Sequence, residues 1–108
     1  MITVQLWHRG QSKIVGFMVA GHAGYAPKGT DIVCAAVSAV TQAALLGLTE
    51  HLGLNPKVEI RTGYLSCMLT PGSEENKAVQ AILATLALAL NDIATQYPGR
   101  IRLKEVES

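Results

Sequence analysis

The feature that most constrains the fold is a pair of long apolar segments with helical patterning, each preceded by two shorter segments with strand patterning. The first helix is predicted over residues 32–52, where Gly53 ends it. The second is predicted to run from an N-cap at Ser73 to the helix breaker Pro98-Gly99, and one more strand follows it. Two helices are too few to cover both faces of a parallel sheet. The sequence therefore predicts an α+β fold, with a mostly antiparallel sheet, two helices packed on one face, and the order ββαββαβ.

The first two predicted strands are expected to form a hairpin. Residues 2–7 alternate apolar and polar side chains, whereas residues 14–20 are apolar on both faces, as in a central strand. The turn between them spans residues 8–12, with His8 exposed to solvent and Gly10 free to adopt a positive φ. The remaining strands are predicted over residues 57–62, 64–70 and 100–106, the last as an edge strand.

Each helix is predicted to pack one side on the sheet. On the first helix we expect that side to be the most apolar stripe: Ile32, Ala36, Ala39, Val40, Ala43 and Leu46. A more polar stripe holds Cys34, Ser38, Thr41, Gln42 and Thr49. The core stripe of the second helix is predicted to be Val79, Ile82, Leu83, Leu86, Leu90, Ile93 and Tyr97. This helix is apolar nearly all round, so it is expected to be either deeply buried or covered by a partner, and in a domain of this size we predict a homodimer.

Composition limits the class of protein. With 108 residues, of which 49% are hydrophobic and 16% charged, the chain is expected to form one domain over residues 1–108. The net charge of +1 is spread without a basic run, which argues against direct nucleic-acid binding. The start of the chain does not resemble a signal peptide, and the longest apolar run, residues 81–90, is too short to span a bilayer. We therefore expect no membrane contact and a cytoplasmic location.

Two further expectations concern cysteine and histidine. The two cysteines have no evident reason to pair, which suits a reducing compartment. Cys67 lies on the same predicted strand face as Leu65 and Leu69, so it is expected in the core. His8 and His51 have no neighbours at metal-ligand spacing, and we predict neither a metal site nor a cofactor.

The stretch from Gly21 to Ser38 carries the candidate chemistry. His22 lies between small residues and is followed by a loop containing glycines and a proline. Asp31 is well placed as the N-cap of the first helix, because its carboxylate can accept hydrogen bonds from the first-turn amides. Cys34 then occupies the third helical position, where the exposed amides and the helix dipole favour a thiolate. Cys34 as nucleophile and His22 as proton acceptor would form a catalytic pair.

The stretch from Gly21 to Ser38 resembles the signature of a known enzyme family. Gly21-His22-Ala23, Tyr25 and the run over residues 31–38 are similar to the motif of the ribosomal-processing cysteine proteases, small bacterial enzymes that remove an N-terminal extension from a large-subunit ribosomal protein. The resemblance covers nearly the whole chain. It implies that His22 is the catalytic histidine, that Cys34 is the nucleophile and that a ribosomal protein precursor is the substrate. It also implies bulky apolar residues before the cut and a small residue after it.

Supporting and substrate-binding roles are expected for Gly21, Tyr25, Asp31 and Ser38. Asp31 could orient His22, although its N-cap role is favoured, and Ser38 lies one turn below Cys34 on the same face. The loop over residues 24–30 is expected to close over the substrate. Backbone amides at the start of the helix, including that of Cys34, are expected to bind the developing oxyanion.

Two readings from other classes stay open at this point. The chain could be a non-catalytic, ribosome-associated binding module, in which the histidine and the cysteine only pack the loop. It could also be a thiol redox or acyl-transfer protein that uses the same activated cysteine. A redox role would need a resolving thiol, and Cys67 on the core face is a poor candidate for one.

Overall fold

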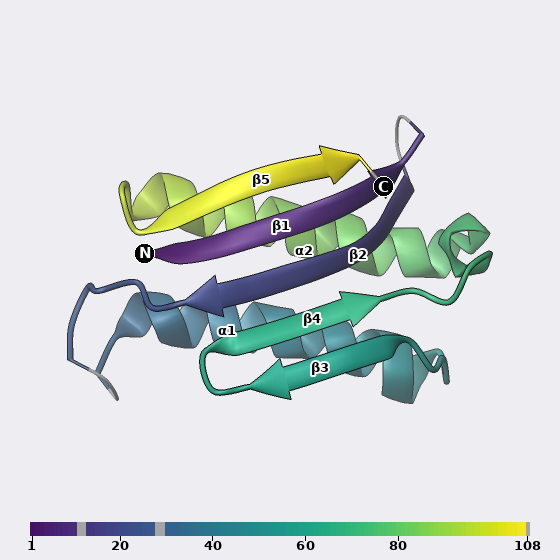
Figure 1. Ribbon diagram of the computed structural model, residues 1–108, viewed down its shortest axis with the longest axis horizontal. Helices are drawn as coiled ribbons and strands as arrows, with labels where there is room; N and C mark the ends of the chain where they lie inside the picture. Colours follow the sequence, from purple (N-terminus) through teal and green to yellow (C-terminus); the bar gives the residue numbers. More distant parts are fainter. Residues whose placement is uncertain (11–12, 28–29, 108) are drawn as a thin grey trace.

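Five strands form one mixed sheet in the computed structural model, which describes residues 1–10, 13–27 and 30–107. Their order across the sheet is β3-β4-β2-β1-β5 (Figure 1). β5 runs parallel to β1, and every other pair is antiparallel. The strands are β1 (Ile2–Arg9), β2 (Lys13–Gly21), β3 (Lys57–Arg61), β4 (Tyr64–Met68) and β5 (Ile101–Glu107). The predicted β1–β2 hairpin, the central β2 and the edge position of β5 are confirmed.

Two helices pack on one face of this sheet, α1 (Ile32–Leu46) behind β2, β4 and β3, and α2 (Lys77–Gln96) behind β1 and β5. A π-helical turn over Gly47–His51 extends α1, and the chain then leaves the helix through Gly53 at a φ of 68°. The predicted α+β fold and the order ββαββαβ are therefore confirmed.

The start of α2 differs from the prediction. Ser73–Glu75 forms a separate 3-10 turn, and Asn76 is the N-cap, accepting hydrogen bonds from the N–H groups of Ala78 and Val79. Ser73 is thus not the cap. The short turn is stabilised instead by buried Glu74, which accepts hydrogen bonds from Arg9 at 3.1 Å and from the N–H of Gly72 at 2.8 Å.

The predicted sheet-facing side of α1 is wrong. The buried residues of the extended helix are Val33, Val37, Thr41, Ala44 and Leu48, whereas Ile32 and Leu46 are 53% and 58% exposed. Small and apolar residues surround this helix, so periodicity alone does not select one side. Thr41 is tolerated in the core because its hydroxyl donates to the carbonyl of Val37 at 2.6 Å.

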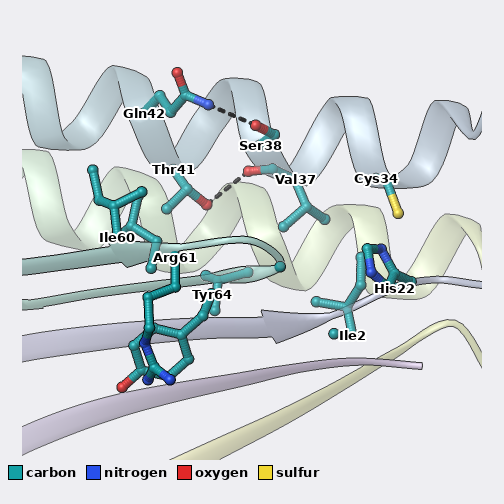
Figure 2. Close-up of a pocket in the computed structure, with 14 residues that line it drawn as sticks. Ile2, His22, Cys34, Val37, Ser38, Thr41, Gln42, Ile60, Arg61 and Tyr64 are labelled. Carbon is teal, nitrogen blue, oxygen red and sulfur yellow. Dashed lines mark hydrogen bonds between the residues drawn. The ribbon is translucent and has the colours of Figure 1, made fainter. Parts of the chain in front are cut away.

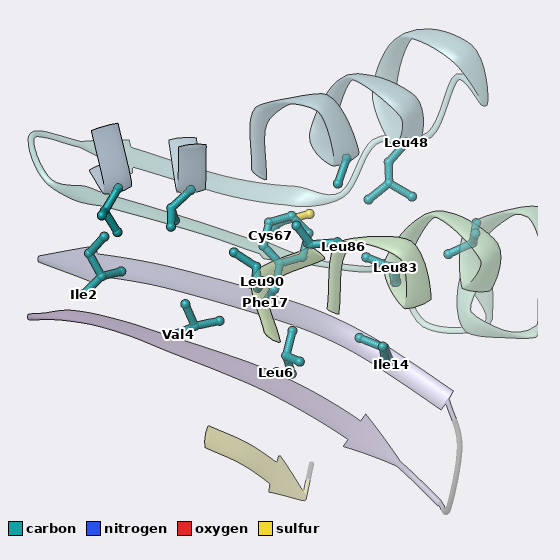
Figure 3. Close-up of a cluster of buried hydrophobic side chains, with 14 of the residues drawn as sticks. Ile2, Val4, Leu6, Ile14, Phe17, Leu48, Cys67, Leu83, Leu86 and Leu90 are labelled. Carbon is teal, nitrogen blue, oxygen red and sulfur yellow. The ribbon is translucent and has the colours of Figure 1, made fainter. Parts of the chain in front are cut away.

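The core fills the space between the sheet and the two helices (Figure 3). The sheet contributes the predicted inward residues of β1 together with Phe17 and Cys67, and α2 contributes its predicted stripe. The members of that stripe that are fully enclosed are Val79, Leu83, Leu86 and Leu90. Alternation along β1 is thus sufficient to identify its buried side.

Two further predictions are corrected. His8 lies within β1 rather than in a turn, and its Nε2 is 3.4 Å from a carboxylate oxygen of Glu105. Of the predicted turn, Gln11 and Ser12 lie outside the described residues.

By length and composition, both Ile32–His51 and Lys77–Gln96 could cross a membrane. The length of the longest uninterrupted apolar run is therefore not enough to judge whether these helices could span a bilayer. In the fold each packs one side on the sheet.

Candidate active site

Asp31 organises the segment between β2 and α1. One carboxylate oxygen accepts hydrogen bonds from the N–H groups of Val33 and Cys34, at 2.9 and 3.0 Å, which confirms the predicted N-cap. The other oxygen accepts from the N–H groups of Tyr25 and Ala26, at 3.0 and 3.4 Å. The hydrogen bond from Cys34, with those from the loop, holds the pKa of Asp31 below its usual range, although burial opposes this shift.

These hydrogen bonds decide two expectations about the site. In the part of the chain that the structure describes, no hydrogen bond joins Asp31 to His22, so Asp31 serves as the N-cap and loop anchor. The N–H of Cys34 was expected to bind an oxyanion, but it donates to Asp31. It is therefore not a free donor.

Cys34 occupies the third position of α1 and is half-buried. Its Sγ accepts a hydrogen bond from the backbone N–H of Ala23 at 3.3 Å. Ala23 itself is buried, so this peptide group is held close to the core. A backbone donor aimed at sulfur stabilises developing negative charge there.

His22 directly follows β2, at an exposed position. Gly21 before it has a φ of 94° and donates its N–H to the carbonyl of Gly63 at 2.9 Å. A Cβ at residue 21 would lie 2.6 Å from the carbonyl oxygen of Met1, so this position requires glycine. In Figure 2 the sulfur of Cys34 is directed towards the imidazole of His22. The fold thus brings the two predicted residues together.

Two cavities meet at this pair, since both are lined by His22, Cys34 and Ser38. The first, of about 260 Å³, lies between α1 and the β3–β4 hairpin; the second, of about 560 Å³, lies beside the loop and the start of α1. The apolar walls of the first are Ile2, Val19, Val37, Ile60 and Leu65. Arg61 and Tyr64 stand on the same hairpin, with the guanidinium 4.1 Å from the ring centroid.

The contribution of the hairpin was missed by sequence reasoning, which treated β3 and β4 only as strands. One signal in the structure marks it: Ile60, a β-branched apolar residue, is 65% exposed beside the cavity. From the sequence alone, Ile60 is indistinguishable from the other apolar residues of an alternating strand. The position of the hairpin next to His22 depends on the pairing of β4 with β2.

The remaining predicted residues differ in how close they are to the pair. Gly21 lines the first cavity and Ser38 lines both, its hydroxyl accepting a hydrogen bond from Gln42 at 2.7 Å. Tyr25 is 45% exposed and packs against Tyr97. Of the loop expected over residues 24–30, positions 28 and 29 lie outside the described residues.

Cys67 lies in the core, as predicted. It is fully buried, and burial raises the pKa of its thiol to about 11. Among residues 1–10, 13–27 and 30–107, no group of three or more His, Cys, Asp or Glu side chains is arranged to hold a metal ion.

Known proteins are similar to this chain over nearly its whole length. The family model described as cysteine protease Prp matches residues 1–102. The chain is 31% identical over 106 residues to the ribosomal processing cysteine protease Prp of Staphylococcus aureus, covering 95% of this chain and 97% of the relative. It is 25% identical over 107 residues to the Bacillus subtilis protein of the same name, covering 95% and 96%.

Solved structures are also similar. The structure of Staphylococcus aureus Prp with a covalently linked product peptide superposes with a TM-score of 0.90 at 28% identity, covering 97% of this chain and 99% of the other. The same protein with a substrate peptide gives 0.84 at 27%, with the same coverage. Sequence, fold and the family model agree over almost the entire chain, and this chain therefore belongs to the cysteine protease Prp family.

Proposed function

We propose that this protein is a cysteine endopeptidase that removes the N-terminal extension of a large-subunit ribosomal protein during ribosome assembly. The observation that carries the proposal is the placement of Cys34 at the start of α1, with its sulfur directed towards His22 where two cavities meet. Its Staphylococcus aureus relative, named a ribosomal processing protease, has been solved with a covalently linked product peptide. Such an adduct supports covalent catalysis in the family.

The reaction follows from the two side chains. The thiol of Cys34 transfers its proton to His22, and the sulfur attacks the carbonyl carbon of the scissile peptide bond. When the C–N bond breaks, His22 delivers the proton to the leaving amine and an acyl-enzyme remains. Water, deprotonated by His22, then attacks the thioester and releases the new carboxyl end and the thiol.

The N–H of Ala23 is the best-placed donor for the negative charge that forms during attack. It already donates to the sulfur at 3.3 Å, and the negative charge develops on the carbonyl oxygen, which is bonded to the carbon that this sulfur attacks. The N–H groups of Val33 and Cys34 are engaged by Asp31. We therefore assign the oxyanion contact to Ala23 in place of Cys34.

The first cavity supports the expected substrate. Its surface is mainly apolar and its volume is about 260 Å³, so it suits a bulky apolar side chain of the residues before the cut. The second cavity shares His22, Cys34 and Ser38 with the first and is otherwise lined mainly by small residues, Gly24, Ala26 and Ala35. We assign it to the residues after the cut.

The test is incubation of the extended ribosomal protein with the native chain, followed by intact mass measurement. Loss of an N-terminal fragment is expected with the native chain and with Cys67→Ala, but not with Cys34→Ser or His22→Ala. Equal processing by Cys34→Ser would remove this thiol from the mechanism. Binding without any cleavage by the native chain would favour the ribosome-associated binding module. Oxidation or acylation of Cys34 without cleavage would favour the redox or acyl-transfer alternative.

We further propose that the chain forms a homodimer and acts in the cytoplasm. A groove of about 390 Å³ between α1 and α2 is lined by Val40, Ala43, Ile82 and Ala89, among others, and Leu88 on α2 is 71% exposed. Apolar surface of this kind supports burial against a second copy. Sedimentation should give a dimer that Leu88→Asp dissociates; a monomer at all concentrations would contradict this. The cytoplasmic location rests on the ribosomal substrate and the two free thiols, and cell fractionation tests it.

A further inference from the structure

The turn between α2 and β5 has a conformation that brings two long side chains together. In Tyr97-Pro98-Gly99-Arg100, proline occupies the second position, and glycine the third with a φ of 79°. The N–H of Arg100 donates to the carbonyl of Tyr97 at 3.2 Å. These are the features of a type II β-turn, which places its first and fourth Cα atoms within about 7 Å. Tyr97 and Arg100 are therefore neighbours.

Both side chains contact the loop that follows His22. A guanidinium N–H of Arg100 donates to the carbonyl of Gly24 at 2.8 Å, and its central carbon is 5.6 Å from the ring centroid of Tyr25. The ring of Tyr97 meets Tyr25 edge-on, with centroids 5.5 Å apart and planes at 81°. Such contacts are individually favourable, and a charge-assisted hydrogen bond is the strongest of them.

The contacted residues are the two that come directly after Ala23, whose N–H points at Cys34. Gly24 has a φ of 68°, so the chain here has a wide choice of conformations unless it is held. Asp31 holds the loop from the side of α1, through the N–H of Tyr25. The turn holds it from the opposite end of the chain, across a sequence separation of 76 residues between Gly24 and Arg100.

We propose that Tyr97 and Arg100 are positioning residues of the active site. They fix Gly24 and Tyr25, and through them the peptide group of Ala23 against the sulfur of Cys34 and the ring of His22 beside it. This inference rests on the proposed protease function. The residues lining the two cavities, as far as the structure describes them, do not include Tyr25, Tyr97 or Arg100. Loss of the contacts should therefore affect the chemical step more than peptide binding.

The experiment compares Arg100→Met and Tyr97→Leu with Arg100→Lys and with Arg102→Ala as the matched control. Arg100→Met keeps the aliphatic stem and removes the donor, whereas Arg100→Lys keeps a cationic donor for Gly24. Arg102 is an exposed arginine on β5, paired with Thr3 in the sheet. Circular dichroism establishes that each variant is folded before it is assayed.

Two readouts are taken. For peptide cleavage, Arg100→Met and Tyr97→Leu are expected to lower kcat by about tenfold or more, because small displacements of catalytic groups have effects of this size or larger. KM should change by less than about threefold, since the first cavity has none of the contacting residues in its wall and Gly24 is the one among them that lines the second. Arg100→Lys should recover part of the loss, and Arg102→Ala should match the native chain.

The second readout does not require cleavage. Alkylation of Cys34 by iodoacetamide is followed at about pH 6.5 and about pH 9.5. The rate at the lower pH divided by the rate at the higher pH reports how well the thiolate is stabilised, separately from how accessible the sulfur is. Arg100→Met and Tyr97→Leu should lower this ratio relative to the native chain and to Arg102→Ala. Native kcat and a native ratio in the folded variants would overturn the proposal. If the native chain cuts no ribosomal precursor, the proposed function fails, while the alkylation ratio still decides the role of the turn.

Discussion

The two thiols of this chain should differ in alkylation rate by at least two orders of magnitude. Cys67 is fully enclosed in the core, and its pKa is raised from 9.0 to about 11. At about pH 8, a thiol with the raised pKa is ionised in roughly one molecule in a thousand, against roughly one in ten at the ordinary value. Because only the thiolate reacts, this effect alone slows Cys67 by about 100-fold.

A reagent can otherwise reach Cys67 only when the core opens. Global opening with a free energy of at least about 5 kcal/mol exposes the thiol in roughly one molecule in several thousand. Both routes therefore predict slow reaction of Cys67. Cys34 is half-buried beside two cavities and needs no such opening.

The assay is timed reaction of the folded chain with iodoacetamide at about pH 8, with the two cysteine peptides quantified by mass spectrometry. We expect Cys34 to be modified at least 100-fold faster than Cys67. Cys34→Ser should remain nearly unlabelled until denaturant is added, and Cys67→Ala should label like the native chain. Modification of Cys67 in folded Cys34→Ser at a rate within about tenfold of a free thiol would refute the reasoning.

Three other predictions concern stability, each measured by urea unfolding. The pKa values of Asp31 and Glu74 are lowered, mainly by backbone hydrogen bonds from Cys34 and from Glu74 itself. Their contribution is therefore full above their ordinary pKa values of 3.8 and 4.5, and is lost as the pH falls through the lower folded values. The loss of unfolding free energy caused by Glu74→Gln should thus be present at about pH 7 and disappear in acid. A loss that grows as the pH falls would contradict a lowered pKa of Glu74. Val37→Ala removes two buried methyl groups and should lower the free energy of unfolding by about 2 kcal/mol, whereas half-exposed Ile32→Ala should cost less than about 1 kcal/mol. Equal losses of stability would indicate that the side of α1 that carries Ile32 packs on the sheet, as the sequence predicted. Gly21→Ala and Gly10→Ala both place a side chain at positive φ, but only the first puts its Cβ 2.6 Å from a carbonyl oxygen. Gly21→Ala should therefore destabilise by at least about 1 kcal/mol more than Gly10→Ala, and an equal effect would show that Met1 moves away freely.

Patterns in neighbouring residues of the sequence were sufficient to predict much of the fold and the site residues His22 and Cys34. Alternation over residues 2–7 identifies the buried side of β1, because one strand face must meet the helices. Asp31 followed by Cys34 three residues later places the thiol in the first turn, because capping depends on neighbouring residues only. His22 is close to Cys34 because the segment after His22 folds back on Asp31, which caps α1 and accepts hydrogen bonds from the N–H groups of Tyr25 and Ala26.

Other features depend on contacts that no local pattern contains. The choice of Asn76 over Ser73 as cap accompanies the pairing of Glu74 with Arg9, which is 65 residues away in sequence. The cavity wall at Ile60 and the contacts of Arg100 with Gly24 depend on which strands pair. For α1, the apolar character on most sides left its orientation to be set by packing.

The parallel pairing of β1 with β5 has a consequence for how the protein is made. Residues 2–8 lie against residues 101–107, so β1 cannot complete its ladder until residues 101–107 have left the ribosome. During synthesis β1 therefore keeps an open edge, the kind that pairs wrongly with other chains. A nascent chain stalled before residue 101 should be more prone to aggregate than one in which β5 is paired with β1.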